Sequence, residues 1–405
     1  MARSVGVAAV TWRAALAAAG CPEVVGSERV PVEDAAGRVA AGPVLARLSA
    51  PAVPCAAMDG IAVLAGPSEV VAAGAFDVVD TGDPLPPGRD AVVMREHLRR
   101  RPDGSVHLRG PAAAGQHVRQ VGESVRAGEL LVAAGRVLRP ADLAAAAAGG
   151  LRELDVRRRP VVTIIPTGDE VRPLGADLVP GELLDTNSLM IAATLRELGC
   201  RVYVTAIQPD DPALIAAAVR GDVHGPSADL VLVLAGSSAG RDDHTPHVIR
   251  SLGSVVVQGV AVRPAHPVLL GVVHGPPAVP VIGVPGYPVS AALAVELFAV
   301  PLLADLQERR LSRARPVPAR LRSAVTSRPD VEEFVLLALR EDGSAEPLSR
   351  GAGAQTALAR ADAALRIDAG CAGHEAGELV MVHPMGAPGW AGSAIASGLG
   401  RLATG

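Results

Sequence analysis

The fold is decided by the stretch Val161-Val162-Thr163-Ile164-Ile165-Pro166-Thr167-Gly168-Asp169-Glu170. Residues 161–166 form a continuous apolar run, which predicts a strand buried on both faces of a sheet. The turn that follows places two carboxylates at the end of this strand. In an open α/β sheet, ligands bind at the carboxyl ends of the strands, so this turn is a candidate binding site.

Two later segments repeat the pattern of an apolar strand followed by a polar turn. Residues 229–234 enter the Gly/Ser-rich loop Ala235-Gly236-Ser237-Ser238-Ala239-Gly240-Arg241-Asp242-Asp243. Residues 279–284 enter a helix through Pro285-Gly286-Tyr287-Pro288-Val289-Ser290. Because the strands between 159 and 308 alternate with helical patterns, we expect a mainly parallel sheet covered on both faces. The three turns should then meet at one edge of that sheet.

Capping signals set the expected helix boundaries. Thr11 is expected to cap a helix over 12–19, and Thr186 or Asn187 a helix that ends near Leu198. Asp211 can cap a helix that has Pro212 in its first turn. Further helices are expected near 246–252 and from 288 to about 306.

The composition indicates several domains and excludes some classes of partner. The 38 Lys and Arg residues against 42 Asp and Glu residues give a formal net charge of -4, so no global basic field suggests a nucleic-acid partner. The four cysteines are far apart and form no CxxC pair, which argues against a zinc knuckle or disulfide framework. No secretory signal or membrane-spanning stretch is evident. We expect a cytoplasmic protein that acts neither on nucleic acid nor at a membrane.

Several polar groups in these turns have both a functional and a structural interpretation. The Gly/Ser loop can cradle an anion, and Asp242, Asp243 and His244 beside it could bind a divalent cation. Alternatively, Asp243 or Thr245 caps the next helix. Asp169 and Glu170 suit metal ligation or general-base chemistry, or an N-cap and a solvated carboxylate.

Two other segments leave the same choice open. Arg263-Pro264-Ala265-His266-Pro267 could hold an oxyanion or form a surface turn. Asp59, between Met58 and Gly60, fits a tight turn in which Asp is common.

The ordered set of motifs resembles the MoeA-type molybdopterin molybdenumtransferase family, which includes the E domain of gephyrin. The resemblance extends over roughly residues 10 to 385. The motifs that carry it are AMDGIAV, TGDPLPPGRDAVV, GESVRAGELL, TGDEV, DTNSLMIAATLRELG, PDDP, AGSSAGRDD and GVPGYPVSAALAVEL.

The resemblance implies a multidomain α/β plus β fold. Its parts are a helical/extended linker domain, a β-rich inserted lobe, a central three-layer α/β molybdopterin-binding-like domain and a C-terminal β-barrel. The corresponding ranges are 1–47 with 139–158, 48–138, 159–308 and 309–385, followed by a flexible tail over 386–405. The resemblance also implies a homodimer, with each active site between the α/β domain of one subunit and the β-rich lobe of the other.

The implied reaction inserts molybdate into adenylated molybdopterin and releases AMP, with Mg²⁺ assisting. The family's AMDG aspartate corresponds to Asp59, its TGDE pair to Asp169 and Glu170, its PDDP aspartates to Asp210 and Asp211, and the aspartate after its glycine-rich loop to Asp243. The implied catalytic residues are Asp59, Glu170 and Asp243, and the implied metal ligands are Asp169, Glu170, Asp242 and Asp243. The implied substrate-binding residues are Thr167, Gly168, Asp169, Asp211, Gly236, Ser237, Ser238, Gly240, Arg263, His266, Pro285, Gly286 and Ser290. A molybdopterin adenylyltransferase and molybdoenzyme maturation proteins are the candidate partners.

The sequence also departs from the family pattern. Arg263 and His266 stand where relatives have the lysines of a KPGKP turn, the loop reads AGSSAGRDD, and Tyr287 stands where most relatives have Asn. Two alternatives therefore stay open beside the molybdenum insertase: a molybdopterin-binding scaffold paralogue without insertion activity, and a tungstate-selective insertase. A pterin adenylyltransferase is disfavoured by the additional β-rich domains.

Overall fold

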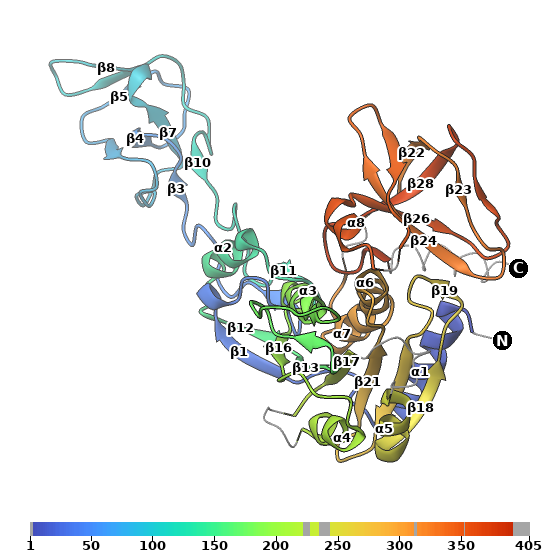
Figure 1. Ribbon diagram of the computed structural model, residues 1–405. Coiled ribbons are helices and arrows are strands. Elements are labelled where there is room, and N and C mark those ends of the chain that lie inside the picture. The colour runs from blue at the N-terminus through green and yellow to red at the C-terminus, as the bar shows by residue number, and fades with distance from the viewer. Residues whose placement is uncertain (1–2, 222–226, 235–243, 312–313, 352, 392–405) are drawn as a thin grey trace, which may run out of the picture. The chain divides into compact units, whose positions relative to one another are not determined.

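The computed structural model describes residues 3–221, 227–234, 244–311, 314–351 and 353–391. The contacts between residues divide the chain into two compact units, coloured by residue number in Figure 1. We call Met1–Gly26 with Arg158–Gly405 the main unit, and Ser27–Arg157 the inserted unit. The main unit holds the α/β sheet and the C-terminal β-domain.

The α/β sheet of the main unit has the strand order β16-β13-β17-β21-β20-β18. Strands β16, β13, β17 and β21 run parallel, whereas β20 and β18 are antiparallel to their neighbours. The prediction of a mainly parallel sheet is confirmed, with an antiparallel pair at one edge. The strands are β13 (Val161–Pro166), β16 (Arg201–Val204), β17 (Leu230–Leu234), β18 (Gly253–Gln258), β20 (Leu269–Val273) and β21 (Val279–Val284).

Helices cover both faces of this sheet because its central strands are apolar on both sides. Leu230, Leu232 and Leu234 of β17 belong to a core that includes α1, α3, α6 and α7, whereas Val231 and Val233 belong to a second core with α4 and α5. The sheet is therefore the middle of three layers. The helices are α1 (Val5–Ala18), α3 (Thr186–Glu197), α4 (Pro212–Arg220), α5 (Thr245–Leu252), α6 (Pro288–Ala294) and α7 (Val300–Leu306), with a π-helical segment η3 (Val295–Ala299) between the last two.

The first helix corrects one prediction from the sequence. Helix α1 begins at Val5 and is capped by Ser4; Thr11 lies inside it and donates a 2.7 Å hydrogen bond to the Val7 carbonyl. The helix packs on β18 and β20, and the Trp12 indole N–H donates to the Gly271 carbonyl at 2.8 Å. Because of these contacts, the segment up to Gly26 belongs to the same compact unit as the α/β sheet, whereas the prediction placed it in the linker domain. The other domain boundaries stay predictions.

The C-terminal β-domain is a closed sheet. Strand β24 pairs with both β25 and β26, and β28 pairs with both β22 and β26, so the strands β24-β25-β22-β28-β26 form a ring. The expectation of a C-terminal barrel is confirmed at this level. The elements are β19 (Val262–Arg263), which joins β24 from the α/β domain, β22 (Val317–Leu321), β23 (Val325–Thr326), β24 (Glu332–Leu339), β25 (Ser344–Pro347), α8 (Gln355–Arg360), β26 (Ala363–Ile367), β27 (Gly373–His374) and β28 (Leu379–Pro384).

The inserted unit is rich in short strands, as the Gly- and Pro-separated apolar runs predict. Its two larger sheets have the orders β6-β4-β7 and β5-β9-β8, and one helix, α2 (Pro140–Ala148), follows them. The strands are β1 (Ser27–Pro31), β2 (Val44–Leu45), β3 (Cys55–Ala56), β4 (Gly60–Val63), β5 (Val70–Val71), β6 (Phe76–Val79), β7 (Ala91–Met94), β8 (Leu98–Arg100), β9 (Val106–Leu108), β10 (Val118–Arg119), β11 (Leu130–Val132) and β12 (Glu153–Arg157), with 3₁₀ turns at Val32–Asp34 and Arg95–His97.

The helical run Pro288–Leu306 is long and apolar enough to span a membrane by length and composition, which the sequence analysis did not anticipate. Of its apolar window, 83% is buried inside the protein. Packing in the core of the main unit accounts for its composition.

The start of the predicted flexible tail is packed against the α/β domain, so that prediction is wrong for residues 389–391. The Glu296 carboxylate accepts the Gly389 N–H at 2.8 Å, and Ala391 is fully buried. The Trp390 ring meets Phe334 edge to face, with 6.2 Å between ring centroids. The sequence gives no local sign of this contact because Glu296 and Gly389 are 93 positions apart.

We expect Glu296→Gln to make stability less sensitive to pH. Burial raises the pKa of Glu296 to about 7; nearby Glu197 reinforces this, and the N–H groups of residues 389–391 oppose it. Because the pKa of Glu296 is higher in the folded than in the unfolded protein, its protonated carboxyl group favours the folded state. This contribution is complete below pH 4.5, the ordinary pKa, and is lost as the pH rises through about 7. The shift of the pKa from 4.5 to about 7 corresponds to about 3 kcal/mol in the free energy of unfolding.

The measurement is the melting temperature of both proteins at pH 5 and pH 8. The Gln variant should gain stability over the unsubstituted protein at pH 8 but much less at pH 5. An equal offset at both pH values would contradict the buried, titrating carboxylate.

Candidate active site

A cavity of about 630 Å³ lies at the carboxyl edge of the α/β sheet. Its walls include Pro166 at the end of β13 and Thr167 after it, Leu234 at the end of β17, and residues 286–288 after β21. The prediction that the three strand ends share one site is thus confirmed for the described residues. The remaining lining residues are Glu170, Val171, Leu178, Leu183, Leu184, Asp185, Thr186, Asn187, Gly353 and Gln355.

The Thr167-Gly168 turn is fixed by the sheet. The Thr167 N–H and hydroxyl both donate to the Leu234 carbonyl, at 2.9 and 3.0 Å, and the Gly168 N–H donates to the Gln208 carbonyl. Gly168 has a φ of +133°, and a Cβ there would lie 2.8 Å from the Val171 side chain. Glycine is therefore required at this position to turn the chain toward Asp169 and Glu170.

Asp169 and Asp210 are held together by a reciprocal pair of hydrogen bonds. The Asp169 N–H donates to the Asp210 carboxylate at 3.3 Å, and the Asp210 N–H donates to the Asp169 carboxylate at 3.2 Å. Burial raises the pKa of Asp210, the negative charges of Asp169 and Glu170 raise it further, and His244 opposes them. Excess negative charge therefore gathers beside the cavity.

The two aspartates of the PDDP segment have different structural roles. The Asp211 carboxylate accepts the N–H groups of Ala213 and Leu214, at 2.7 and 3.2 Å, and caps α4 as predicted. Asp210, which was not selected for the site, is the one that lies beside Asp169. The sequence does contain a signal for this difference. An aspartate directly before a proline is expected to cap the helix that begins there, so Asp210 and not Asp211 is the candidate for the site.

The N-terminus of α3 forms another wall. Its cap is Asp185, not Thr186 or Asn187 as expected, and the Asp185 carboxylate accepts the Ser188 N–H at 3.0 Å. The Asn187 amide donates to the Gly286 carbonyl at 2.6 Å, which ties α3 to the turn after β21. The Asn187 Oδ1 and Ser188 Oγ atoms are buried without hydrogen-bond partners in the described residues.

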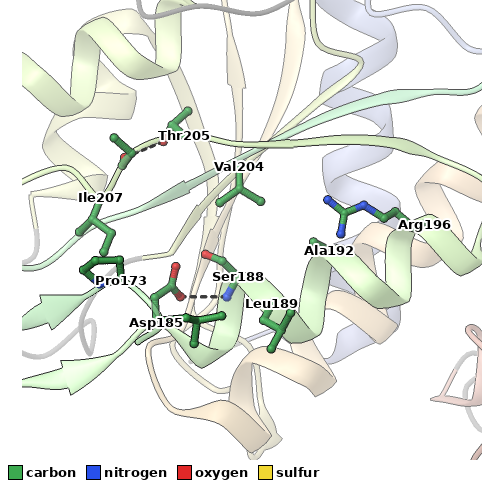
Figure 2. Close-up of a pocket in the computed structure, with 11 residues that line it drawn as sticks. Pro173, Asp185, Ser188, Leu189, Ala192, Arg196, Val204, Thr205 and Ile207 are labelled. Carbon is green, nitrogen blue, oxygen red and sulfur yellow. Dashed lines mark hydrogen bonds between the residues drawn. The ribbon is translucent and has the colours of Figure 1, made fainter. Parts of the chain in front are cut away.

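A second hollow, of about 540 Å³, shares Asp185 with the first cavity, and Figure 2 shows the residues that line it. It lies between α3 and the end of β16. Its walls are mostly apolar, with Leu189, Val204 and Ile207 among them. None of the predicted site residues that the structure describes lines it.

Other predicted residues lie outside the cavity wall. Pro285 and Ser290 are buried, and Ser290 is only 4% exposed. Arg263 and His266 are exposed, and an imidazole nitrogen of His266 lies 2.5 Å from the Val260 carbonyl oxygen. Strand β19, which ends at Arg263, forms a parallel pair with β24, and Arg263 lies opposite Glu333 in the strand register. This turn therefore also joins the α/β domain to the C-terminal β-domain.

Six predicted residues lie outside the described part of the chain: Gly236, Ser237, Ser238, Gly240, Asp242 and Asp243. Within the described ranges, no group of three or more His, Cys, Asp or Glu side chains could hold a metal ion. The predicted metal site, half of which is Asp242 and Asp243, stays a prediction.

Asp59 lies in the inserted unit, in the turn before β4. Its Oδ1 accepts the Thr81 N–H and hydroxyl, at 2.8 and 2.7 Å, and its Oδ2 accepts from Arg95 at 2.9 Å. The Thr81 hydrogen bonds, and then the Arg95 charge, hold the pKa of Asp59 below its usual value. Gly60 must be glycine because a Cβ there would lie 2.0 Å from the Val93 carbonyl oxygen. The turn therefore presents a fixed, half-exposed carboxylate.

Comparisons with known proteins agree for the greater part of the chain, between residues 9 and 385. Residues 9–150 match the MoeA N-terminal region (domain I and II), 163–305 a probable molybdopterin binding domain, and 318–385 the MoeA C-terminal region (domain IV). Molybdopterin molybdenumtransferase 2 of Mycobacterium tuberculosis is 35% identical over 331 residues, 73% of this chain and 78% of the relative. Molybdopterin molybdenumtransferase of Haemophilus influenzae is 29% identical over 72% of this chain and 75% of the relative.

A solved structure shows the same architecture. The molybdopterin biosynthesis MoeA protein from Pyrococcus horikoshii superposes with a TM-score of 0.81 at 29% identity, over 94% of this chain and 98% of that one. The matched segments keep the order that the sequence motifs indicate. This chain belongs to the MoeA family, whose curated relatives are molybdopterin molybdenumtransferases.

Proposed function

We propose that this chain inserts molybdate into adenylated molybdopterin and releases AMP, in the biosynthesis of the molybdenum cofactor. The observation that carries the proposal is the cavity at the carboxyl edge of the sheet, which has apolar walls and Glu170 beside the Asp169–Asp210 pair. Its volume suits an organic substrate of the size of a nucleotide or a pterin. Family membership supplies the substrate and reaction class.

In this reaction the pterin dithiolene sulfurs replace oxygen ligands of molybdate, and water cleaves the phosphoanhydride bond to AMP. Asp59, Glu170 and Asp243 would be the acidic catalytic residues. Arg263 and His266 would bind the oxyanions, to which the Arg263 guanidinium brings a permanent positive charge. Within a homodimer, Asp59 would act in the cleft of the partner subunit.

Mg²⁺ would be held by Asp169 and Glu170, with Asp242 and Asp243. The support is the type of donor at the two described positions: Asp169 and Glu170 carry carboxylates, which Mg²⁺ prefers, and Glu170 lines the cavity. When bound, Mg²⁺ would stabilise the charge that develops on the leaving phosphate. We place the protein in the cytoplasm, where a molybdopterin adenylyltransferase would supply its substrate.

The deciding experiment measures AMP release from adenylated molybdopterin by the purified protein, with and without molybdate and Mg²⁺. Molybdate-dependent release would support the insertase. Tight pterin binding without release would favour the scaffold alternative instead. Faster release with tungstate than with molybdate would identify a tungstate-selective insertase.

We expect Glu170→Gln to raise the Mg²⁺ concentration needed for half-maximal AMP release by about 10- to 100-fold, because a carboxylate at the metal site is lost. Titration of AMP release with Mg²⁺ measures this shift. Glu341→Gln is the matched control, since Glu341 is exposed in a turn of the C-terminal domain. An unchanged Mg²⁺ dependence of the Glu170 variant would remove Glu170 from the metal site.

A further inference from the structure

Tyr287 is the one aromatic residue among the described residues that line the 630 Å³ cavity. The chain has only two tyrosines, two tryptophans and three phenylalanines, so an aromatic residue in a cavity wall is uncommon in this protein. Tyr287 is 55% exposed. A large ring left half-exposed at the mouth of a cavity is a feature that core packing does not explain.

The backbone of Tyr287 is held from both sides. The Tyr287 carbonyl accepts the Ala291 N–H at 2.8 Å as α6 begins, and the preceding Gly286 carbonyl accepts the Asn187 amide at 2.6 Å. These two contacts fix the point from which the side chain leaves the main chain. The Cα–Cβ bond of Tyr287 therefore has a fixed direction relative to the cavity wall.

The C-terminal domain supports the ring. A Cβ added to Gly353 would lie 3.5 Å from Cδ1 and 3.9 Å from Cε1 of Tyr287, so the Gly353 backbone lies close to one side of the ring. Around this contact, Val289 of α6 packs with Leu336 of β24 and Ala357 of α8 in a small buried cluster. Among the described residues, the only ring–ring contact is Phe334 with Trp390, so no protein ring stacks on Tyr287.

The other walls suit a flat, partly apolar ligand. Leu178 and Leu183 are exposed, and both line the same cavity as Tyr287. The Gln355 amide and the Thr186 hydroxyl are polar groups that can hydrogen-bond to the edge of a ring. A planar ring between an aromatic face and aliphatic side chains, with polar groups at its edge, is a common arrangement in ligand pockets.

We infer that Tyr287 is a stacking platform for a heteroaromatic ring of the substrate. The inference rests on the proposed function, because adenylated molybdopterin carries two such rings, the pterin and the adenine. Stacking of a base on an aromatic side chain strengthens binding about 5- to 150-fold by substitution experiments. The ring face supplies this effect, so the Tyr287 hydroxyl group is not needed for it.

The test compares Tyr287→Leu, which keeps an apolar side chain but removes the ring face, with Tyr287→Phe, which keeps the face. Binding of AMP and of molybdopterin is titrated separately by calorimetry. We expect Tyr287→Leu to weaken binding of one of them by about 5- to 150-fold and Tyr287→Phe to stay within about twofold. Loss of AMP affinity assigns the platform to adenine, and loss of molybdopterin affinity assigns it to the pterin.

Tyr203→Leu is the matched control, because Tyr203 is the other tyrosine and lies on β16, outside this cavity. Unchanged binding of both ligands by Tyr287→Leu, or an equal loss with Tyr287→Phe, would overturn the inference. Molybdate-dependent AMP release by the unsubstituted protein is measured in parallel. If that release occurs, the proposed function stands whatever the Tyr287 variants show.

Discussion

Replacing Asp59 by alanine is expected to reduce molybdate-dependent AMP release by about 10²- to 10⁴-fold, the range for a positioned acid–base or charge-stabilising group. The expectation follows from how the side chain is held. Both carboxylate oxygens are oriented, one by Thr81 and the other by Arg95, and these contacts keep the group ionised. A half-exposed carboxylate fixed in this way can act on a ligand without first reorganising.

The fold should survive this substitution. The Asp59 side chain is 45% exposed, and the turn is also held by the pairing of β4 with β7. Melting temperature and circular dichroism of the variant should therefore match those of the unsubstituted protein. A loss of activity accompanied by unfolding of the inserted unit would not support a catalytic Asp59.

Asp103→Ala is an unusually close control. Asp103 lies in the same unit, and its carboxylate accepts the Ser105 N–H and hydroxyl at 2.9 and 2.6 Å, much as Asp59 accepts those of Thr81. These bonds also hold its pKa low. If both variants release AMP at the unsubstituted rate, or if both lose activity equally, Asp59 has no special role in the reaction.

The sequence predicted those strands and helices that are specified by residues close together in the chain. The Val-, Leu- and Ile-rich runs of β13, β17 and β21 indicate strands buried on both faces, so the sheet and its polar edge follow from the sequence. The start of α4 also follows from the sequence, because Asp211 directly before Pro212 is a local capping signal. The cavity formed by the three strand ends is a direct consequence of their parallel order.

The errors concern choices that only tertiary contacts decide. Thr11 and Ser4 are both good caps by type, but the helix extends back to Ser4 because Val5 and Ala8 find buried positions in the sheet core. The Gly- and Ala-rich composition after Gly386 suggests a flexible chain, yet Glu296 supplies a partner for the Gly389 N–H.

We expect Trp12→Ala to destabilise the main unit by about 3–5 kcal/mol, the usual cost of removing a large buried aromatic side chain. Trp12 is 2% exposed and packs in the larger core of the α/β domain. Its indole N–H also satisfies the Gly271 carbonyl in the middle of β20. Val10→Ala on the same helix is the control, because Val10 is 66% exposed and should cost little.

Hydrogen exchange of the β20 amides is the suitable measurement, because a chain of several domains does not unfold in a single two-state step. The expected loss of stability corresponds to exchange that is roughly 10²- to 5 × 10³-fold faster. The exchange rate in Trp12→Phe should lie between those of Val10→Ala and Trp12→Ala. Phenylalanine keeps an apolar ring but lacks the indole N–H that donates to the Gly271 carbonyl. If β20 exchanges at the same rate in Trp12→Ala, the sheet core closes without α1, and the grouping of residues 1–26 with the α/β domain has no energetic basis.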